Sequence, residues 1–250
     1  MSFLKNIFSK NELANEPFDL SVLKCDVHSH LIPGIDDGVK TLHESIAILE
    51  GFKDLGYQKI ITTPHVMSDF YRNSSSTILR GRDIVKEELL RKNIDLDFEV
   101  AAEYYLDEHF EELLAKKDLL TFGDNHVLFE LSFHTEPMAL NRVIFEMQTK
   151  GYHPVLAHPE RYPYYNEDFE KYHSFVDKGV ILQLNINSLS GGYSPMNKKV
   201  AKRLVEENMI ELLGSDCHHS GHLNAIRMES SRSITLKTLL DSGKLINDKL

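Results

Sequence analysis

Short apolar runs alternate with amphipathic stretches along the chain, and this alternation restricts the possible folds more than any other feature. Seven runs read as buried strands, and they cover residues 23–28, 59–64, 97–103, 126–131, 154–159, 180–186 and 210–216. Between them, apolar residues recur at the i, i+3, i+4 spacing of helices that pack against a core, the last over about residues 222–242. Repeated strand–helix units build a parallel sheet covered by helices, either an open doubly wound sheet or a closed β/α barrel.

The chain reads as one domain. Its 250 residues contain no internal repeat, low-complexity tract or linker, and this length suits a single α/β domain. Neither of the glycine-rich nucleotide-binding motifs occurs, which disfavours a nucleotide site. We expect the domain over residues 21–250, preceded by a leader over residues 1–20. The leader's first ten residues permit a short membrane-surface helix, although a packing or frayed leader is favoured.

Charge and cysteine content exclude several classes of protein. The formal net charge is −10, so the chain lacks the basic surface of nucleic-acid-binding proteins. Two cysteines, Cys25 and Cys217, are too few for a disulfide framework, and no signal peptide or apolar membrane span occurs. We therefore expect a cytoplasmic protein without a nucleic-acid partner, and we expect both cysteines to lie in the core.

Imidazole and carboxylate side chains recur where the apolar runs end. They are His28, His30, His65, Glu103, Glu130, His158, Asp216 and His218, and the loop after the first run adds Asp36 and Asp37. In a parallel barrel the carboxyl ends of the strands lie on one face, where active sites of that architecture sit. We therefore expect these side chains to converge on one mouth.

The spacing of these donors favours metal binding. Residues two apart on an extended strand point to the same side, so His28 and His30 can reach one cation. Asp216 and His218 repeat that spacing. Imidazole and carboxylate donors suit manganese, iron, cobalt or zinc rather than softer metals. The donors outnumber the ligands of one structural zinc, so we expect two or three divalent ions, with a carboxylate such as Glu103 or Glu130 bridging them.

Phosphate ester hydrolysis fits such a site. Neighbouring metal ions stabilise the attacking and leaving oxygens of an in-line displacement and lower the pKa of water. Arg161, just past the fifth run, can bind phosphoryl oxygens; its alternative role is an ion pair with Glu160 or another carboxylate at the rim. Neither cysteine is followed by an arginine six residues on, which disfavours a thiolate phosphatase.

Several stretches, in this order and spacing, resemble the PHP (polymerase and histidinol phosphatase) superfamily. They are DVHSHLIPGIDDG, TTPH, AAEYY, LFELSF, AHPERY and GSDCHH. Within it, the best match is to the bacterial CpsB- and YwqE-like metal-dependent protein-tyrosine phosphatases, over roughly residues 23–240. The resemblance implies a distorted (β/α)7 barrel with a trinuclear, usually manganese, site. The implied ligands are His28, His30, Asp37, His65, Glu103, Glu130, His158, Asp216 and His218.

The resemblance also implies a substrate and a partner. Arg161 would be the phosphate-binding arginine. Family substrates are phosphotyrosines on the tail of a bacterial tyrosine kinase that controls capsular or exopolysaccharide synthesis, which would bring a cytoplasmic enzyme to the inner face of the membrane. Relatives often carry a second arginine after the D-x-H motif. Here His222 or Arg227 would have to replace it.

Two further features have a functional and an ordinary interpretation. Five tyrosines near the expected mouth can either stack on a phosphotyrosine ring or pack at the bases of loops; they are Tyr104, Tyr105, Tyr162, Tyr164 and Tyr165. The polar segment 70–82, with three arginines, can be a lid or partner contact, and a solvated loop is the simpler expectation.

Other functions remain open. A phosphatase acting on histidinol phosphate or another small monoester would use the same fold and metals. A metal-stabilised adaptor that docks on a kinase without turnover is a second alternative, although no expected ligand is missing. An amidohydrolase ranks lower, because that group commonly bridges its metals with a carboxylated lysine where this chain has Glu130.

Overall fold

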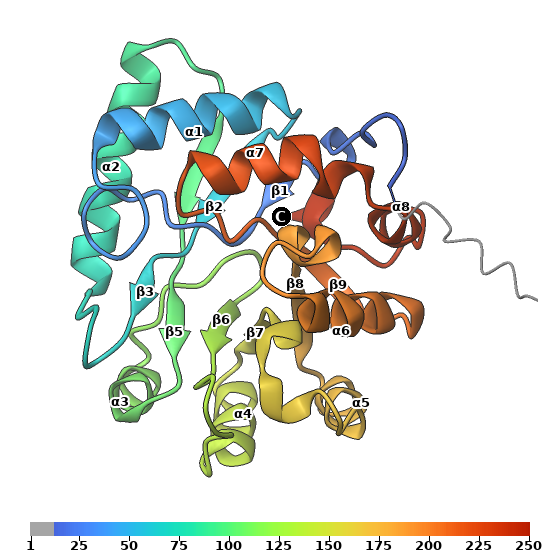
Figure 1. Cartoon of the computed structure of the whole chain (residues 1–250). Coiled ribbons are helices and arrows are strands. Elements are labelled where there is room, and N and C mark those ends of the chain that lie inside the picture. The colour runs from blue at the N-terminus through green and yellow to red at the C-terminus, as the bar shows by residue number, and fades with distance from the viewer. Residues whose placement is uncertain (1–12) are drawn as a thin grey trace, which may run out of the picture.

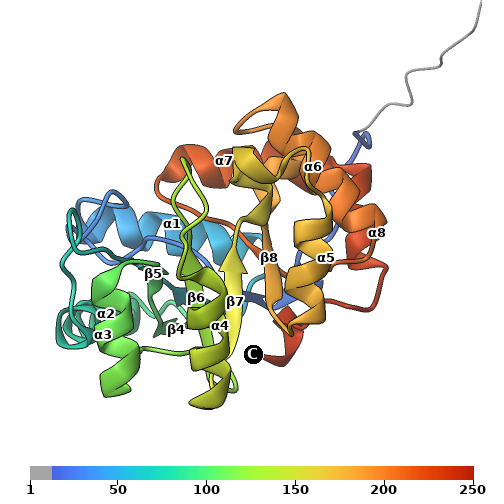
Figure 2. The ribbon, with the colours of Figure 1, turned by 90° about the horizontal axis from the view of Figure 1, so that it is seen from below.

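The computed structural model describes residues 13–250 (Figures 1 and 2). The strands are β1 (Cys25–Asp26), β2 (Lys59–Thr62), β3 (His65–Val66), β4 (Asp97–Val100), β5 (Glu103–Tyr105), β6 (His126–Glu130), β7 (His153–Ala157), β8 (Ile181–Asn185) and β9 (Ile210–Gly214). The helices are α1 (Leu42–Asp54), α2 (Ser75–Arg91), α3 (Glu108–Lys116), α4 (Leu140–Thr149), α5 (Glu170–Asp177), α6 (Pro195–Glu206), α7 (Ser220–Met228) and α8 (Ile234–Leu240). Each of the seven apolar runs contains a strand, which confirms the alternation read from the sequence.

Two parallel sheets form a single α/β domain. One sheet has the order β1-β2-β4 and the other β3-β5-β6-β7-β8-β9, and every pair is parallel. The chain passes from β2 into β3 and from β4 into β5 after two residues each, so the two sheets follow one another. A parallel bridge between Ser29 and Cys217, with His30 N donating to Cys217 O at 2.9 Å, connects the first strand to the last. The structure is therefore a single α/β domain of parallel sheets, and the bridge brings the residues after β1 next to those after β9.

The helices cover the outside of the strands. Helices α3, α4, α5 and α6 lie outside the six-stranded sheet in both views, and α1 and α7 lie side by side (Figures 1 and 2). Helix α1 begins with a capping box, since Thr41 and Glu44 each bond the other's backbone N–H. Between the helices and the strands lies one large apolar core. Among the described residues, no helix combines the length and apolar character needed to cross a membrane.

The prediction of one helix over about residues 222–242 is wrong. The chain instead forms α7 and α8, separated by a short 3-10 helix, Ser230–Arg232. Buried serines explain the break, because their hydroxyls bond groups outside a continuous helix. Ser230 Oγ donates to Asn187 Oδ1 at 2.9 Å, and Ser233 Oγ accepts from Leu236 N at the start of α8.

The described part of the leader runs beside this break. Ala14 N donates to Arg232 O at 2.8 Å, and Phe18 N donates to Ser231 O at 2.6 Å. The first ten residues, for which a membrane-surface helix was the less favoured interpretation, lie outside the described residues. Residues 14–18 thus follow the segment that joins α7 to α8.

Both cysteines are core residues, as predicted. Cys25 and Cys217 are free and buried. Burial raises the pKa of Cys25 to about 12 and also raises that of Cys217. Neither thiol is therefore poised as a nucleophile near neutral pH.

Candidate active site

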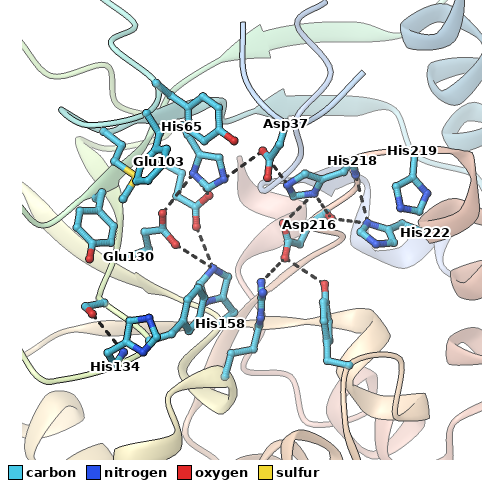
Figure 3. Close-up of a pocket in the computed structure, with 18 residues that line it drawn as sticks. Asp37, His65, Glu103, Glu130, His134, His158, Asp216, His218, His219 and His222 are labelled. Atoms are coloured by element: carbon cyan, nitrogen blue, oxygen red, sulfur yellow. Dashed lines mark hydrogen bonds and ion pairs between the residues drawn. The ribbon is translucent and has the colours of Figure 1, made fainter. Parts of the chain in front are cut away.

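The carboxyl ends of the strands surround a pocket of about 650 Å³ (Figure 3). The residues predicted for the site that line it are Asp37, His65, Glu103, Glu130, His158, Arg161, Asp216, His218 and His222. His28 and His30 are completely buried and contact both Glu103 and Asp216. Residues from β1 to the loop after β9 therefore meet at one place, because parallel strands bring their carboxyl ends to the same face.

The donor atoms fall into four overlapping groups. The groups are His30–Asp37–His65–His218, His28–His30–Asp216, His28–Glu103–His158 and His65–Glu103–Glu130, with the atoms of each within 4.8 Å of one another. Together they contain all nine residues expected from the sequence to bind metal. Because the groups share members, their arrangement suits several neighbouring cations rather than one.

Glu103 stands at the centre of the donors. Its Oε2 lies 3.2 Å from His28 Nε2 and 3.4 Å from His30 Nε2. The same oxygen is 3.1 Å from His65 Nδ1, and Oε1 is 3.0 Å from His158 Nε2. Neither Glu103 Oε2 nor His65 Nδ1 has a hydrogen bond of acceptable geometry although both are buried. Buried polar atoms without partners are costly, and bound cations would satisfy them, so the residues fit a metal cluster.

Two of the proposed ligands, each just past the end of a strand, have a left-handed backbone conformation. His158 has φ 36° and Asp216 has φ 48°. Non-glycine residues rarely adopt this conformation, and it concentrates at functional sites. For Asp216 it is held by a hydrogen bond from its own N–H to His28 O at 2.8 Å. The turn carries the chain from β9 across to β1, where Asp216 Oδ1 lies 3.5 Å from both His28 Nε2 and His30 Nε2.

The buried charges hold one another ionised. Burial disfavours the imidazolium of His28, but the carboxylates of Glu103 and Asp216 outweigh it and raise the pKa of His28 to about 9. Burial also opposes the charge on Glu103, yet His28 and His65 hold its pKa well below the usual range. The pKa of Asp216 is likewise well below its ordinary value, with His28 as the main partner opposing burial. Divalent cations can replace the protons of these imidazoles, because metal binding requires the neutral ring.

The structure separates the two adjacent aspartates. Asp37 Oδ1 lies 3.5 Å from His65 Nε2 and 3.4 Å from His218 Nε2. Asp36 faces the other way: its Oδ2 is 2.9 Å from His30 Nδ1 and accepts from His65 N at 3.1 Å. Asp37 therefore belongs to the donor groups, whereas Asp36 orients the ring of His30 from behind.

Arg161 is aimed into the pocket. Its Nη1 donates to Asp216 Oδ2 at 2.9 Å, and its guanidinium carbon lies 4.9 Å from the ring centre of Phe133 and 4.5 Å from that of Tyr193. The rim carboxylate that it pairs with is thus Asp216 rather than Glu160. Stacking on aromatic rings restrains the guanidinium while its N–H groups stay available as donors.

Of the two candidates to replace a second arginine, one lies in the pocket. His222 lines it, with Nδ1 3.0 Å from Asp216 O and 3.3 Å from His218 N. Arg227 instead lines a separate cavity between α1 and α7, where Nη2 donates to Gly51 O at 3.3 Å. Only His222 is therefore placed to meet a ligand in this pocket.

Of the two interpretations of the five tyrosines, stacking on a ligand remains open for one of them only. Tyr104, Tyr162 and Tyr165 are buried, and Tyr164 OH donates to Ser132 O at 2.8 Å, so of these five only Tyr105 lines the pocket. Tyr162 OH, for example, donates to Ala157 O at 3.1 Å and accepts from Leu131 N at 3.0 Å. The other aromatic side chains at the pocket are Phe70, Tyr71, Phe133 and Tyr193. Phe70 and Tyr71 lie in segment 70–82, for which the sequence left a lid or a solvated loop open, whereas Phe133 and Tyr193 were missed.

Comparison with known proteins agrees with this geometry. Residues 24–242 match the family described as "Capsular polysaccharide synthesis, CpsB/CapC". Tyrosine-protein phosphatase YwqE of Bacillus subtilis (strain 168) is 32% identical over 195 residues, which cover 78% of this chain and 77% of YwqE. Tyrosine-protein phosphatase CpsB of Streptococcus pneumoniae is 29% identical over 204 residues, 78% of this chain and 82% of CpsB.

A solved structure gives the same result at the level of the fold. It comes from a study of YwqE from Bacillus subtilis and CpsB from Streptococcus pneumoniae, described as unique metal-dependent tyrosine phosphatases. It aligns with a TM-score of 0.76 and 28% identity over 90% of both chains. The sequence match, the shared fold and the assembled donors support one assignment: this chain belongs to the CpsB/CapC family.

Proposed function

We propose that this protein is a metal-dependent protein-tyrosine phosphatase. The observation that carries the proposal is the set of overlapping donor groups beside an arginine aimed into the same pocket. A phosphoryl group needs positive charge around its oxygens in the transition state, and this pocket offers both a metal site and a guanidinium. The named relatives are tyrosine-protein phosphatases, which supports a phosphotyrosyl substrate.

The proposed cofactor is a cluster of two or three divalent ions. Manganese is our first choice, with iron, cobalt and zinc as alternatives, because the donors are imidazoles and carboxylates. The nine residues of the four donor groups would hold the ions. When bound, such ions supply positive charge near the phosphorus and make water a stronger nucleophile. Arg161 would bind the phosphoryl oxygens, and His222 would bind them or the leaving oxygen from the rim.

The proposed substrate is a phosphotyrosine on the tail of a cognate bacterial tyrosine kinase that controls capsular or exopolysaccharide synthesis. The family description and the names of the relatives support this setting. The protein would act in the cytoplasm and meet the inner face of the membrane through that partner. We assign the phosphatase domain to residues 21–250 and treat residues 1–20 as a leader outside it.

Substrate preference tests the proposal. We expect turnover of a phosphotyrosyl peptide with kcat/KM on the order of 10²-fold or more above that for histidinol phosphate, because the pocket rim is aromatic. Steady-state kinetics on both substrates with the manganese-loaded protein measure this ratio. A preference for histidinol phosphate would replace the proposal with a small-monoester phosphatase, and no turnover of either would favour an adaptor.

Phe70 provides a probe of the rim in the same assay. Its side chain lines the pocket and is 73% exposed, so its removal should leave the fold and the donors intact. We expect Phe70→Ala to raise KM for the peptide about 3–10-fold, a loss of about 1 kcal/mol of aromatic contact. Leu90→Ala, on an equally exposed apolar residue outside the pocket, is the matched control.

Replacing Arg161 by alanine should reduce catalysis without removing metal. We expect kcat/KM to fall on the order of 10²-fold, because one donor to the phosphoryl group is lost. Asp216 Oδ2 still accepts from Asn185 Nδ2 at 2.7 Å and from Tyr193 OH at 3.0 Å, so metal content should stay at the wild-type level. Arg142→Ala, on an exposed arginine paired with Glu111 and Glu146, is the control. Unchanged kinetics of Arg161→Ala would remove this arginine from the site.

A further inference from the structure

Strand β8 carries none of the proposed ligands, yet it places two amide side chains inside the barrel. Gln183 and Asn185 are two residues apart and both completely buried, in a strand that otherwise reads Ile-Leu-x-Leu-x. Residues two apart on a strand share one face, and a buried amide is costly unless its donors and acceptors are satisfied. The hydrogen-bond partners of the two amides therefore indicate the role of this face of β8.

Gln183 bonds the ring of His28. Gln183 Oε1 lies 2.6 Å from His28 Nδ1, and Gln183 Nε2 donates to Asn185 Oδ1 at 3.0 Å. With the amide nitrogen committed to Asn185, the oxygen must accept, so His28 carries its proton on Nδ1. In the neutral ring that metal binding requires, the lone pair is then on Nε2, which faces Glu103 and Asp216 on the side of the donor groups.

Asn185 continues the same chain of hydrogen bonds to Asp216. Its Nδ2 donates to Asp216 Oδ2 at 2.7 Å. Tyr193 OH and Arg161 Nη1 donate to that oxygen as well, at 3.0 Å and 2.9 Å. The other oxygen, Oδ1, lies 3.5 Å from both His28 Nε2 and His30 Nε2 and 3.4 Å from His218 Nδ1, all of them imidazoles of the donor groups. One oxygen of Asp216 is thus fixed by donors on the protein side, and the other is left facing the cluster.

A glycine makes room for this arrangement. A Cβ on Gly214 of β9 would lie 2.6 Å from both Gln183 Nε2 and His28 Cβ, closer than real side chains approach. The contact between His28 and Gln183 therefore requires a residue without a side chain at position 214. The packing around Gly214 is independent of the hydrogen bonds and supports the same arrangement.

We propose that Gln183 and Asn185 form an amide relay that sets the tautomer of His28 and the free oxygen of Asp216 for metal binding. Both are positioning residues, and neither is a ligand. The inference rests on the proposed function in one respect only, that His28 and Asp216 bind metal. Partners that orient metal ligands are typically worth 10–100-fold in metal affinity.

Metal affinity of Gln183 variants tests the relay. The probe is Zn²⁺, measured by competition with a chromophoric chelator on the full chain. We expect Gln183→Met, which removes the acceptor of His28 Nδ1–H, to weaken binding about 10–100-fold. Gln183→Glu keeps an acceptor for His28 Nδ1–H and should bind more tightly than Gln183→Met. Equal affinities of Gln183→Met and the wild type would overturn the proposal.

Asn247 supplies a matched control for loss of a buried amide. Its Nδ2 donates to Cys25 O and Leu213 O, so it also ties β1 to β9, but away from the donors. Asn247→Leu should lower the melting temperature and leave Zn²⁺ affinity unchanged. If Asn247→Leu and Gln183→Met weaken binding equally, Gln183 has only a structural role and the proposal is wrong.

A spectrum of the wild-type protein keeps the test independent of any variant. In the Zn²⁺-loaded, ¹⁵N-histidine-labelled chain, His28 should show a proton on Nδ1 and none on Nε2. The opposite tautomer overturns the relay while leaving the phosphatase proposal standing. A wild-type protein that binds no metal contradicts both, and one that binds metal but hydrolyses no phosphate ester contradicts the proposed function alone.

Discussion

Glu103→Gln is expected to abolish phosphatase activity, with kcat/KM reduced on the order of 10³-fold or more, because it removes the charge at the centre of the donor groups. Four imidazole nitrogens lie within 3.4 Å of its two carboxylate oxygens. A neutral amide can replace one of these oxygens only with an N–H group that repels a cation. The variant should therefore also lose bound metal, measured by elemental analysis of the purified protein. Glutamine has nearly the same shape, so the protein should stay folded.

Glu99→Gln is the control for this experiment. Glu99 lies on β4, partly exposed, and pairs with Lys86 at 2.6 Å rather than with any proposed ligand, so the change should cost little. Alanine at His28, Glu130 or Asp216 should resemble Glu103→Gln in both activity and metal content. Full activity of Asp216→Ala would end the assignment of that residue as a ligand.

Removal of metal should abolish turnover and lower thermal stability together. Chelation with EDTA leaves buried carboxylates and imidazoles without the cations that we propose between them. A metal present at 100 times its Kd stabilises the native state by about 2.7 kcal/mol, which corresponds to a melting temperature higher by about 5–10 °C for a chain of this size. We expect both activity and melting temperature to return on addition of Mn²⁺.

Alkylation of thiols separates this mechanism from cysteine chemistry. Cys25 and Cys217 are 2% and 0% exposed, and burial raises the pKa of both thiols. Iodoacetamide should therefore leave the activity of the folded protein unchanged. Activity that survives exhaustive chelation but is lost on alkylation would contradict the metal-dependent mechanism.

Much of the fold could be predicted from the sequence because it depends on local periodicity. Apolar runs that end in polar residues mark buried strands, and all seven were found. The convergence of His65, Glu103 and Glu130 follows from a general rule, since parallel strands present their carboxyl ends on one face. The capping box at the start of α1 is equally local, because Thr41 and Glu44 are three residues apart.

Loops and breaks were less predictable. The helical spacing of apolar residues continues through the serines that follow α7, so the sequence predicted one helix there. The break depends on a distant partner, because the hydroxyl of Ser230 donates to Asn187. The sequence left open whether the tyrosines at strand ends stack on a ligand or pack at loop bases, and Tyr162 is turned inward by hydrogen bonds to the backbone of Leu131 and Ala157. The position of loop residues such as Phe70 at the pocket could not be predicted, because loop conformation follows no periodic sequence pattern.

The sequence by itself determined which donor types this protein has and that they stand where strands end. Only the tertiary structure decided how those donors are oriented: which nitrogen of His28 faces Glu103, which oxygen of Asp216 is free, and which carboxylate Arg161 meets. The physical reason is distance along the chain. The bond between His28 and Gln183 joins residues 155 positions apart, and that between Arg161 and Asp216 joins residues 55 apart, so these contacts exist only once the strands have assembled around the site.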